Sequence, residues 1–400
     1  MTENAEASGQ DLRRRATLLI VLLGLVSLFA DMTYESARSI NGPYLATLGA
    51  GALVVGVVAG AGELVGYALR VLAGIVSDRT QRLWSIVIAG YALNLLAVPL
   101  LALTTRWEAA AALILLERAG RAIRSPSRDA MLSQAAARTG VGWGFGLHEA
   151  VDQIGAVAGP LALGALLLAR PGYAGAYAWL GLPALAAMAC LLGAWRAFPT
   201  PQVFEPPAAE APAERLRPAF WVYAAGAALL GAGFVDFPLI AFHLQQQHTA
   251  PNWAPWLYAL AMGSDGVAAL GLGLLFDRHG LSVMALAALC SALAVPLVFL
   301  GGLTGLIVGL VLWGVAMAAQ ESVLRAAIAR LVPVQWRGRA YGTFNAIFGL
   351  GWFAGSALLG YTYDRSLTVM VALSCALQLA SVPVFLAVSR RLPVTPVERR

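Results

Sequence analysis

The 400-residue sequence contains no lysine, so all 27 of its Lys or Arg positions are arginines. A lysine Schiff base, a lysine nucleophile and the lysine-bearing phosphate loop of an ATP-driven pump are therefore excluded. Charged residues make up only 12% of the chain, about half the share of an average soluble domain. Its three cysteines, Cys190, Cys290 and Cys375, lie in different apolar runs without metal-site spacing. These absences argue against a soluble enzyme and against a metal centre.

Most of the chain consists of apolar residues. Hydrophobic residues account for 59% of it, and the mean hydropathy is +0.73. A helix that crosses a bilayer needs roughly 20 apolar residues. Twelve such runs are predicted, centred near residues 31, 64, 93, 117, 155, 184, 232, 265, 291, 316, 350 and 378.

An internal repeat divides these twelve runs into two sets of six. Eight small or apolar residues in the fifth run recur 196 positions later in the eleventh. The first copy is Gly142, Gly146, Ala150, Gly155, Ala158, Gly159, Leu163 and Gly164, and the second is Gly338, Gly342, Ala346, Gly351, Ala354, Gly355, Leu359 and Gly360. Two parallel halves of this kind are typical of a transporter with a central site between them.

The predicted fold is an all-α membrane protein with twelve transmembrane helices in two pseudo-symmetric six-helix bundles. The bundles span residues 1–197 and 218–400, and the proline-rich segment 198–217 is the predicted linker. Most arginines lie in loops on one side of this arrangement, against Arg106, Arg170 and Arg365 on the other. The excess of arginine predicts an inner-membrane protein with both termini in the cytoplasm. It also explains the net charge of +6 without nucleic-acid binding.

Two loop motifs resemble the cytoplasmic loops of the major facilitator superfamily. The motif after the second run is Gly74, Asp78, Arg79 and Arg82, and its echo after the eighth is Gly273, Asp277, Arg278 and Gly280. The first copy departs from the family pattern at Gln81, where the family usually has glycine. The resemblance covers essentially the whole chain, and it implies that these residues form a cytoplasmic gate in which Asp78 and Asp277 take hydrogen bonds from helix N-termini.

The fifth run is similar to the antiporter motif of drug/proton exporters in that superfamily. The motif residues here are Gly155, Gly159, Pro160 and Gly164, and the resemblance implies export. Tight helix packing is the alternative explanation, because the eleventh run repeats the glycines and places Ser356 at the position of Pro160.

Ionisable residues inside the predicted spans are the candidate functional groups, because each costs at least ~2.5 kcal/mol near the bilayer centre. Asp31, Glu35 and Arg38 lie on one face of the first span. The candidates for proton coupling are Asp31, Glu35, Glu63, Glu117, Glu149 and Asp152. The candidates for the substrate cavity are Tyr34, Arg38, Arg118, Arg121, Phe234, Asp236, Asp265, Glu321, Arg325 and Asn345. We expect proton handling mainly in the N-terminal half and aromatic contacts in the C-terminal half.

The function predicted from these residues is proton-coupled alternating access, with export of a small organic compound by antiport. The first alternative is uptake or exchange of an anionic metabolite held by cavity arginines. Pairing of Arg118 and Arg121 with Glu117, Glu149 or Asp152 favours a hydrophobic or cationic substrate, and an unpaired arginine favours an anion. A membrane receptor without transport is a distant alternative. We expect a monomer without cofactor, metal or enzymatic activity, whose partners are protons, a small molecule and lipid.

Overall fold

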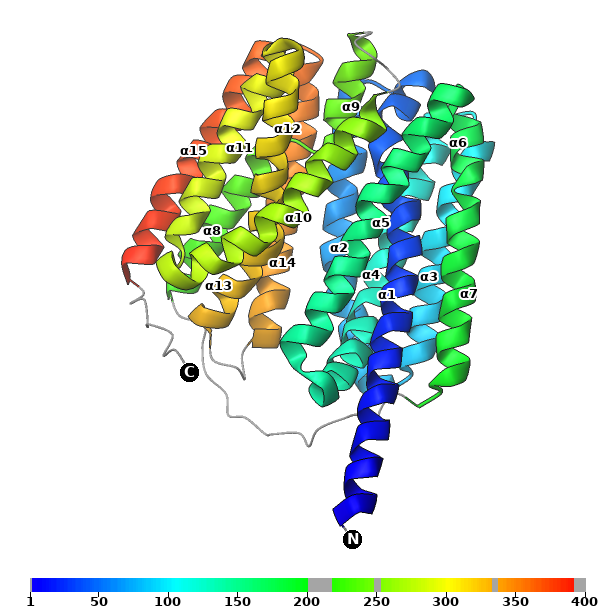
Figure 1. The fold of residues 1–400 in the computed structure, drawn as a ribbon. Helices are drawn as coiled ribbons and strands as arrows, with labels where there is room; N and C mark the ends of the chain where they lie inside the picture. The colour runs from blue at the N-terminus through cyan, green and yellow to red at the C-terminus, as the bar shows by residue number, and fades with distance from the viewer. Residues whose placement is uncertain (1, 201–217, 248–252, 333–336, 392–400) are drawn as a thin grey trace. The chain divides into compact units, whose positions relative to one another are not determined.

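In the computed structural model of the protein, residues 2–200, 218–247, 253–332 and 337–391 are described. Every regular element in these ranges is a helix (Figure 1). Eleven described helices are long and apolar enough to cross a membrane. The twelfth, α4, has the length but carries Glu117, Arg118, Arg121 and Arg124. The predicted all-α membrane fold is confirmed.

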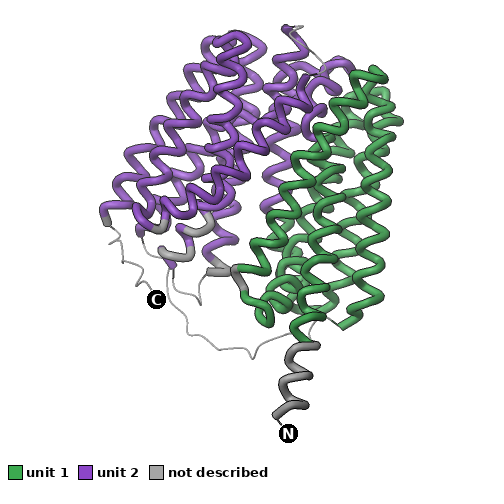
Figure 2. Tube along the Cα trace, in the orientation of Figure 1, with its two compact units in different colours: residues 1–37, 69–210 green, residues 38–68, 211–400 purple. Residues whose placement is uncertain are grey.

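The residue contacts divide the chain into two compact units, which Figure 2 colours separately. Unit 1 comprises residues 1–37 and 69–210, and so includes the first part of α1 and the last part of α2. Its helices are α1 (Thr2–Thr47), α2 (Ala52–Thr80), α3 (Leu83–Leu100), η1 (Leu101–Leu103), α4 (Trp107–Thr139), α5 (Val141–Ala169), α6 (Tyr173–Trp179) and α7 (Gly181–Ala197).

Unit 2 comprises residues 38–68 and 211–400, so it holds the adjoining parts of α1 and α2 together with the C-terminal helices. These helices are α8 (Pro218–Gly233), α9 (Phe237–Gln246), α10 (Ala254–His279), α11 (Ser282–Leu300), α12 (Gly302–Ala318), the π-helical turn η3 (Ala319–Val323), α13 (Leu324–Leu331), α14 (Arg337–Tyr363) and α15 (Leu367–Arg391).

Close glycine contacts explain why residues 38–68 group with the C-terminal helices. Gly42 of α1 lies against the Pro238 backbone of α9, and Gly56 of α2 lies against the Ser356 backbone of α14. A Cβ at Gly60 would be 2.9 Å from the Cα of Phe353, closer than real side chains approach. Residues 201–217 of the predicted linker lie outside the described residues, so the division into two six-helix bundles stays a prediction.

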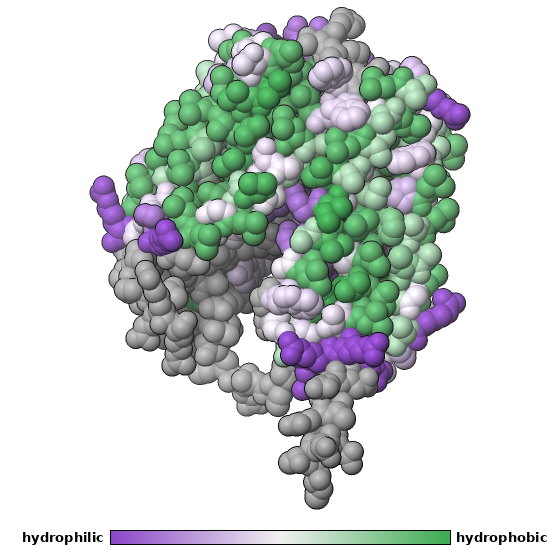
Figure 3. Space-filling view, viewed as in Figure 1, coloured by the Kyte–Doolittle hydropathy of each residue, from purple (hydrophilic) through white to green (hydrophobic). Residues whose placement is uncertain are grey.

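On the face that Figure 3 shows, most of the described surface is hydrophobic, and the most hydrophilic residues lie mainly toward its two ends. Leu103, Val267 and Leu270 each expose 77% of their surface. Large apolar groups with that exposure are costly in water but suit contact with lipid tails. This distribution agrees with a multi-pass membrane protein.

The glycines of the internal repeat lie against the backbone of a neighbouring helix in both copies. In unit 1, Gly155 and Gly159 of α5 lie against the backbone of α1 at Leu28 and Met32. In unit 2, Gly351 and Gly355 of α14 lie against the backbone of α8 at Ala228 and Ala232. Small residues spaced by four let two helices approach closely in the membrane. The repeat therefore records a duplicated helix pair, and its glycines have a structural role in each half.

The loop motif has a residue with positive φ at the same position in both copies. Gln81 has φ of 54° and is the one non-glycine residue in the described part of the chain with positive φ. Gly280, at the matching position of the second copy, has φ of 62°. Glycine adopts positive φ without the strain that a Cβ introduces. Both copies of the motif therefore pass through a residue with positive φ, which is less favourable at Gln81 than at Gly280.

The seventh predicted span is interrupted, which the sequence analysis did not anticipate. Helix α8 ends at Gly233, and α9 begins at Phe237 after the extended residue Asp236. Pro238, at the second position of α9, has no backbone N–H to continue a helical ladder. The Gly233 carbonyl accepts hydrogen bonds from Ser374 Oγ (2.5 Å) and Gln378 Nε2 (2.9 Å). These side chains satisfy a backbone group that a membrane interior otherwise leaves unpaired.

Introducing a larger side chain at Gly159 tests the packing of α5 on α1. We expect Gly159→Leu to lower the thermal unfolding temperature of the purified protein, because its Cβ would lie 2.6 Å from the Met32 Cα. Overpacking of this kind costs typically about 1–3 kcal/mol or more. Gly146→Leu on the same helix is the control, since no atom lies within 4 Å of a Cβ there. Equal unfolding temperatures for the two variants would contradict this packing.

Candidate functional site

Arg38 links two acidic residues in unit 2. Its Nη2 lies 3.4 Å from Glu63 Oε1 and 3.6 Å from Asp236 Oδ1. The three side chains come from α1, α2 and the break before α9, and their exposed fractions are 6%, 16% and 3%. One cation therefore lies between two carboxylates in a nearly dry site. We call Arg38, Glu63 and Asp236 the shared-arginine site.

Asp236 is held by neutral donors as well as by Arg38. Its Oδ2 accepts hydrogen bonds from Trp352 Nε1 (2.8 Å) and Ser356 Oγ (2.9 Å), both on α14. Hydrogen bonds to a carboxylate orient it and partly compensate its loss of water. The sequence analysis noted Ser356 only as the residue replacing Pro160 in the repeat, and Trp352 had no sequence signal.

A second group of charged residues lies in unit 1. Tyr34 Oη donates a hydrogen bond to Asp31 Oδ1, and both residues are on α1. Glu35 Oε1 accepts from Arg121 Nη1 of α4 at 3.2 Å. The Arg121 guanidinium also lies over the Tyr34 ring, 4.3 Å from its centroid. The structure thus brings together four predicted site residues from two helices.

Glu117 and Arg118 form a neighbouring ion pair on α4. Arg118 Nε lies 3.5 Å from Glu117 Oε2, and Asn94 Nδ2 of α3 donates to Glu117 Oε1 at 2.7 Å. Both fourth-span arginines of the cavity prediction therefore have carboxylate partners. Arg118 pairs with the predicted Glu117, whereas Arg121 pairs with Glu35, which was not among the partners proposed for it.

Arg124 is a buried cation on α4 that was not among the predicted site residues. It is 1% exposed, and its guanidinium lies over the Tyr91 ring at 4.0 Å and the Tyr34 ring at 5.6 Å. Its Nε and Nη1 atoms, and the Tyr91 hydroxyl, are buried without a hydrogen-bond partner among the described residues. Stacking on aromatic rings stabilises a cation, but it does not satisfy N–H donors.

The acidic candidates on α5 are more exposed to solvent than the carboxylates that pair with the two fourth-span arginines of the cavity prediction. Glu149 is exposed, Asp152 is half-buried, and His148 is buried with its Nε2 3.5 Å from Ser27 Oγ. Arg128 Nη1 donates to the same Ser27 oxygen at 3.3 Å. Asp152 is close enough to Asp31 for the two carboxylates to repel each other, so α5 contributes a negative charge beside the charged group on α1.

The C-terminal candidates occupy different environments. Phe234 is fully buried between Trp313 and Trp352, with ring centroids 5.1 and 5.3 Å away, so it belongs to an aromatic core. Asp265 is buried on α10, Asn345 is half-buried on α14, and Glu321 is exposed at the π-helical turn. The side chain of Arg325 lies outside the described residues. The stacked rings of Phe344 and Phe348 extend the aromatic core along α14.

The predicted cytoplasmic gate is only partly described. Asp78, Arg79, Arg82 and Arg278 are exposed, Gly74 and Gly273 are half-buried, and the side chain of Asp277 lies outside the described residues. A carboxylate does cap a helix elsewhere in unit 2. Asp364, just after α14, accepts hydrogen bonds from the backbone N–H groups of Ala52 (3.1 Å) and Leu53 (2.9 Å) at the start of α2.

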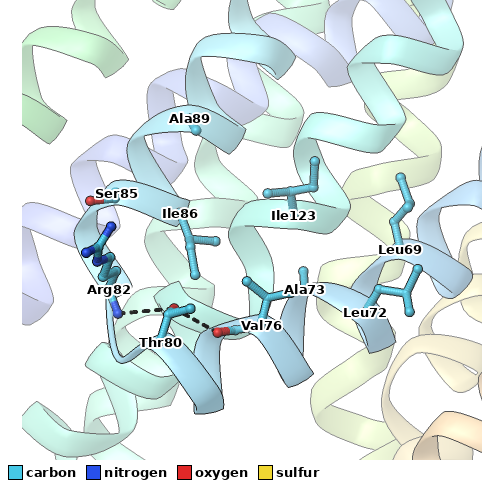
Figure 4. Close-up of a pocket in the computed structure, with 10 residues that line it drawn as sticks. All are labelled: Leu69, Leu72, Ala73, Val76, Thr80, Arg82, Ser85, Ile86, Ala89 and Ile123. Carbon is cyan, nitrogen blue, oxygen red and sulfur yellow. Dashed lines mark hydrogen bonds between the residues drawn. The ribbon is translucent and has the colours of Figure 1, made fainter.

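A groove of about 460 Å³ lies in unit 1 between α2, α3 and α4 (Figure 4). Its walls are apolar, with Leu72 and Val76 from α2, Ile86 from α3 and Ile123 from α4. Arg82 lines it near the α2–α3 turn. No acidic residue is among the described residues that line this groove.

The family match identifies the chain as a secondary transporter and not as an enzyme. Residues 23–356 and 235–399 match the profile of the Major Facilitator Superfamily, and the chain belongs to this family. It is 41% identical to the uncharacterized protein Rv2265 of Mycobacterium tuberculosis over 94% of this chain and 93% of that protein. It is 35% identical to an uncharacterized MFS-type transporter, MJ1317 of Methanocaldococcus jannaschii, over 35% of each chain.

Solved structures share the fold at low sequence identity. A variant of the nucleoside transporter NupG superposes with a TM-score of 0.75 and 15% identity, covering 92% of this chain and 99% of that one. The peptide transporter POT in complex with sulfate superposes with a TM-score of 0.73 and 13% identity, covering 94% of each chain. These likenesses support the fold alone.

Removing the cation of the shared-arginine site tests its electrostatics. We expect Arg38→Met to destabilise the protein by about 3–5 kcal/mol at neutral pH, because two buried carboxylates lose their counter-charge. Adding Asp236→Asn should recover part of that loss in thermal unfolding. Acidification should also reduce it, since a protonated acid needs no cation. Arg106→Gln, at a side chain that is 74% exposed, is the control and should have little effect.

An Arg38→Met protein as stable as the parent at neutral pH would contradict the ion pairing. Failure of Asp236→Asn to recover any stability would show that Asp236 is not the charge that Arg38 neutralises.

Proposed function

We propose that the protein is a proton-coupled antiporter that exports a lipophilic neutral or cationic organic compound. The observation that carries the proton coupling is Arg38, which lies within 3.4 and 3.6 Å of the two carboxylates Glu63 and Asp236. With both acids ionised, the shared-arginine site bears one negative charge more than its arginine neutralises. A proton on either acid balances the site, so binding and release of a proton change which carboxylate Arg38 holds.

Such an exchange of partners is a two-state element of the kind that couples a ligand to a conformational equilibrium. Arg38, Glu63 and Asp236 lie on three separate elements, α1, α2 and the start of α9. A change in pairing therefore alters the attraction between these elements, so we expect proton binding to change the positions of the helices.

The proposed substrate charge follows from the fourth-span arginines. Arg118 lies 3.5 Å from Glu117, and Arg121 lies 3.2 Å from Glu35. Neutralised arginines attract an anionic substrate only weakly, because the substrate must first displace their carboxylate partners. A neutral or cationic compound meets no such competition.

The direction of transport and the orientation of the chain rest on the sequence patterns. Gly155 through Pro160 resembles the antiporter motif, although these glycines also pack α5 on α1. The arginine distribution supports cytoplasmic termini in an inner membrane. Within this orientation Asp78 and Asp277 are the proposed cytoplasmic gate residues.

A second candidate function is uptake or exchange of an organic anion. Arg124 favours it, because this buried cation has two N–H groups without an acceptor among the described residues. The substrate's negative charge would then take the place of a protein carboxylate.

Flux into proteoliposomes with an acidic interior tests both candidates. With the membrane potential clamped by valinomycin and equal potassium, we expect tetraphenylphosphonium to accumulate while protons leave, and nigericin to abolish this. Glu63→Gln, Asp236→Asn and Asp31→Asn should each lower gradient-driven accumulation about tenfold or more, a barrier change of at least about 1.4 kcal/mol. Glu108→Gln, at an exposed carboxylate paired with Arg106, is the control.

Accumulation that persists after nigericin, or that is unchanged in all three variants, would refute proton coupling through these acids. Transport of benzoate in place of tetraphenylphosphonium would reject the cation proposal and favour the anion candidate.

A further inference from the structure

We propose that Arg124 is the alternative partner of Asp31, which pairs with it when Asp31 loses its proton. The inference rests on the proposed proton coupling and adds a positioning residue to it. In this structure the Asp31 carboxyl is held by the Tyr34 hydroxyl, and the Arg124 guanidinium lies between the Tyr34 and Tyr91 rings.

The unsatisfied donors of Arg124 are the primary observation. A buried N–H group without an acceptor costs about 1–3 kcal/mol, and more when the group is charged. Arg124 carries two such groups, Nε and Nη1. Both are shielded from solvent, so bulk water does not satisfy them. A second state of the protein that supplied an acceptor to these N–H groups would remove that free-energy cost.

Asp31 is the acid placed to supply that acceptor. Asp31 is 4% exposed, and both Arg121 and Arg124 interact with it electrostatically. Arg121 already pairs with Glu35 at 3.2 Å. Arg124 is therefore the cation near Asp31 that has no carboxylate of its own among the described residues.

The charged and titratable groups around this pair come from four helices. They are Asp31, Tyr34 and Glu35 on α1, Tyr91 on α3, Glu117, Arg121, Arg124 and Arg128 on α4, and His148 and Asp152 on α5. Glu117 interacts electrostatically with Arg124 but forms its ion pair with Arg118. Glu35 and Asp152 repel an ionised Asp31, whereas Arg121 and Arg124 attract it.

The proposed step is a proton release with a change of partner. The O–H bond of protonated Asp31 breaks, and the proton passes to water. The negative charge left on Asp31 is neutralised by Arg124, whose N–H groups gain their missing acceptor. Tyr34 is the neutral partner that holds the protonated carboxyl. The exchange moves the α1 side chain toward α4 and so links proton release to the packing of these helices.

Infrared difference spectra of the purified protein between acidic and alkaline buffers test this proposal without any substrate. The C=O stretching band of a protonated carboxyl reports Asp31, and the component absent from Asp31→Asn is assigned to it. We expect Arg124→Gln to raise the pH midpoint of that component by about one unit or more, because an opposite charge nearby favours the ionised acid. Arg106→Gln, far more exposed, is the control and should leave the midpoint unchanged.

Arg124→Met fills the same space between the two rings and replaces Arg124→Gln if that variant does not fold. An unchanged midpoint in the folded Arg124 variant would overturn the proposal, as would spectra of Asp31→Asn identical to those of the parent protein. The readout measures titration of Asp31 and not transport. Failure of gradient-driven flux would instead refute the proposed function.

Discussion

The sharing of Arg38 between Glu63 and Asp236 is the interaction on which the functional account depends. A membrane interior supplies no water to buried charges, so each charge needs a partner or a change of protonation. One arginine cannot fully neutralise two carboxylates. The neutral donors Trp352 and Ser356 hold Asp236 in place, and the broken seventh span allows this residue to reach Arg38.

The same constraint shapes the scaffold. Helices in the membrane pack closely through glycine, as α5 does on α1 at Gly155 and α14 does on α8 at Gly351. Where the helix is interrupted after Gly233, the side chains of Ser374 and Gln378 donate hydrogen bonds to the Gly233 carbonyl. Charge and packing thus follow the same tendency, which is that a polar group leaving water meets a defined partner, and the Arg124 donors stand out as an exception to it.

Much of the fold was predictable from the sequence, because span length, apolarity and the repeat are local or periodic signals. The sequence indicated which charged residues belong to the site, but it did not indicate which of them form ion pairs with one another. Asp31, Glu35, Arg38, Glu63 and Arg121 were found as costly charges, yet the contact of Arg38 with Asp236 joins residues almost two hundred positions apart. Phe234 was predicted as a cavity residue from its position, but its packing between two tryptophans was not predictable, since hydropathy does not distinguish a cavity wall from packed rings.

Proton release on ligand binding is the most direct test of the central claim. Isothermal titration of tetraphenylphosphonium into the purified protein, repeated in buffers of different ionisation enthalpy, counts the protons exchanged on binding. The account predicts release of about one proton by the parent protein and a marked loss of that release in Glu63→Gln, because linkage ties ligand binding to the proton occupancy of the site. Binding without proton release by the parent protein would contradict it.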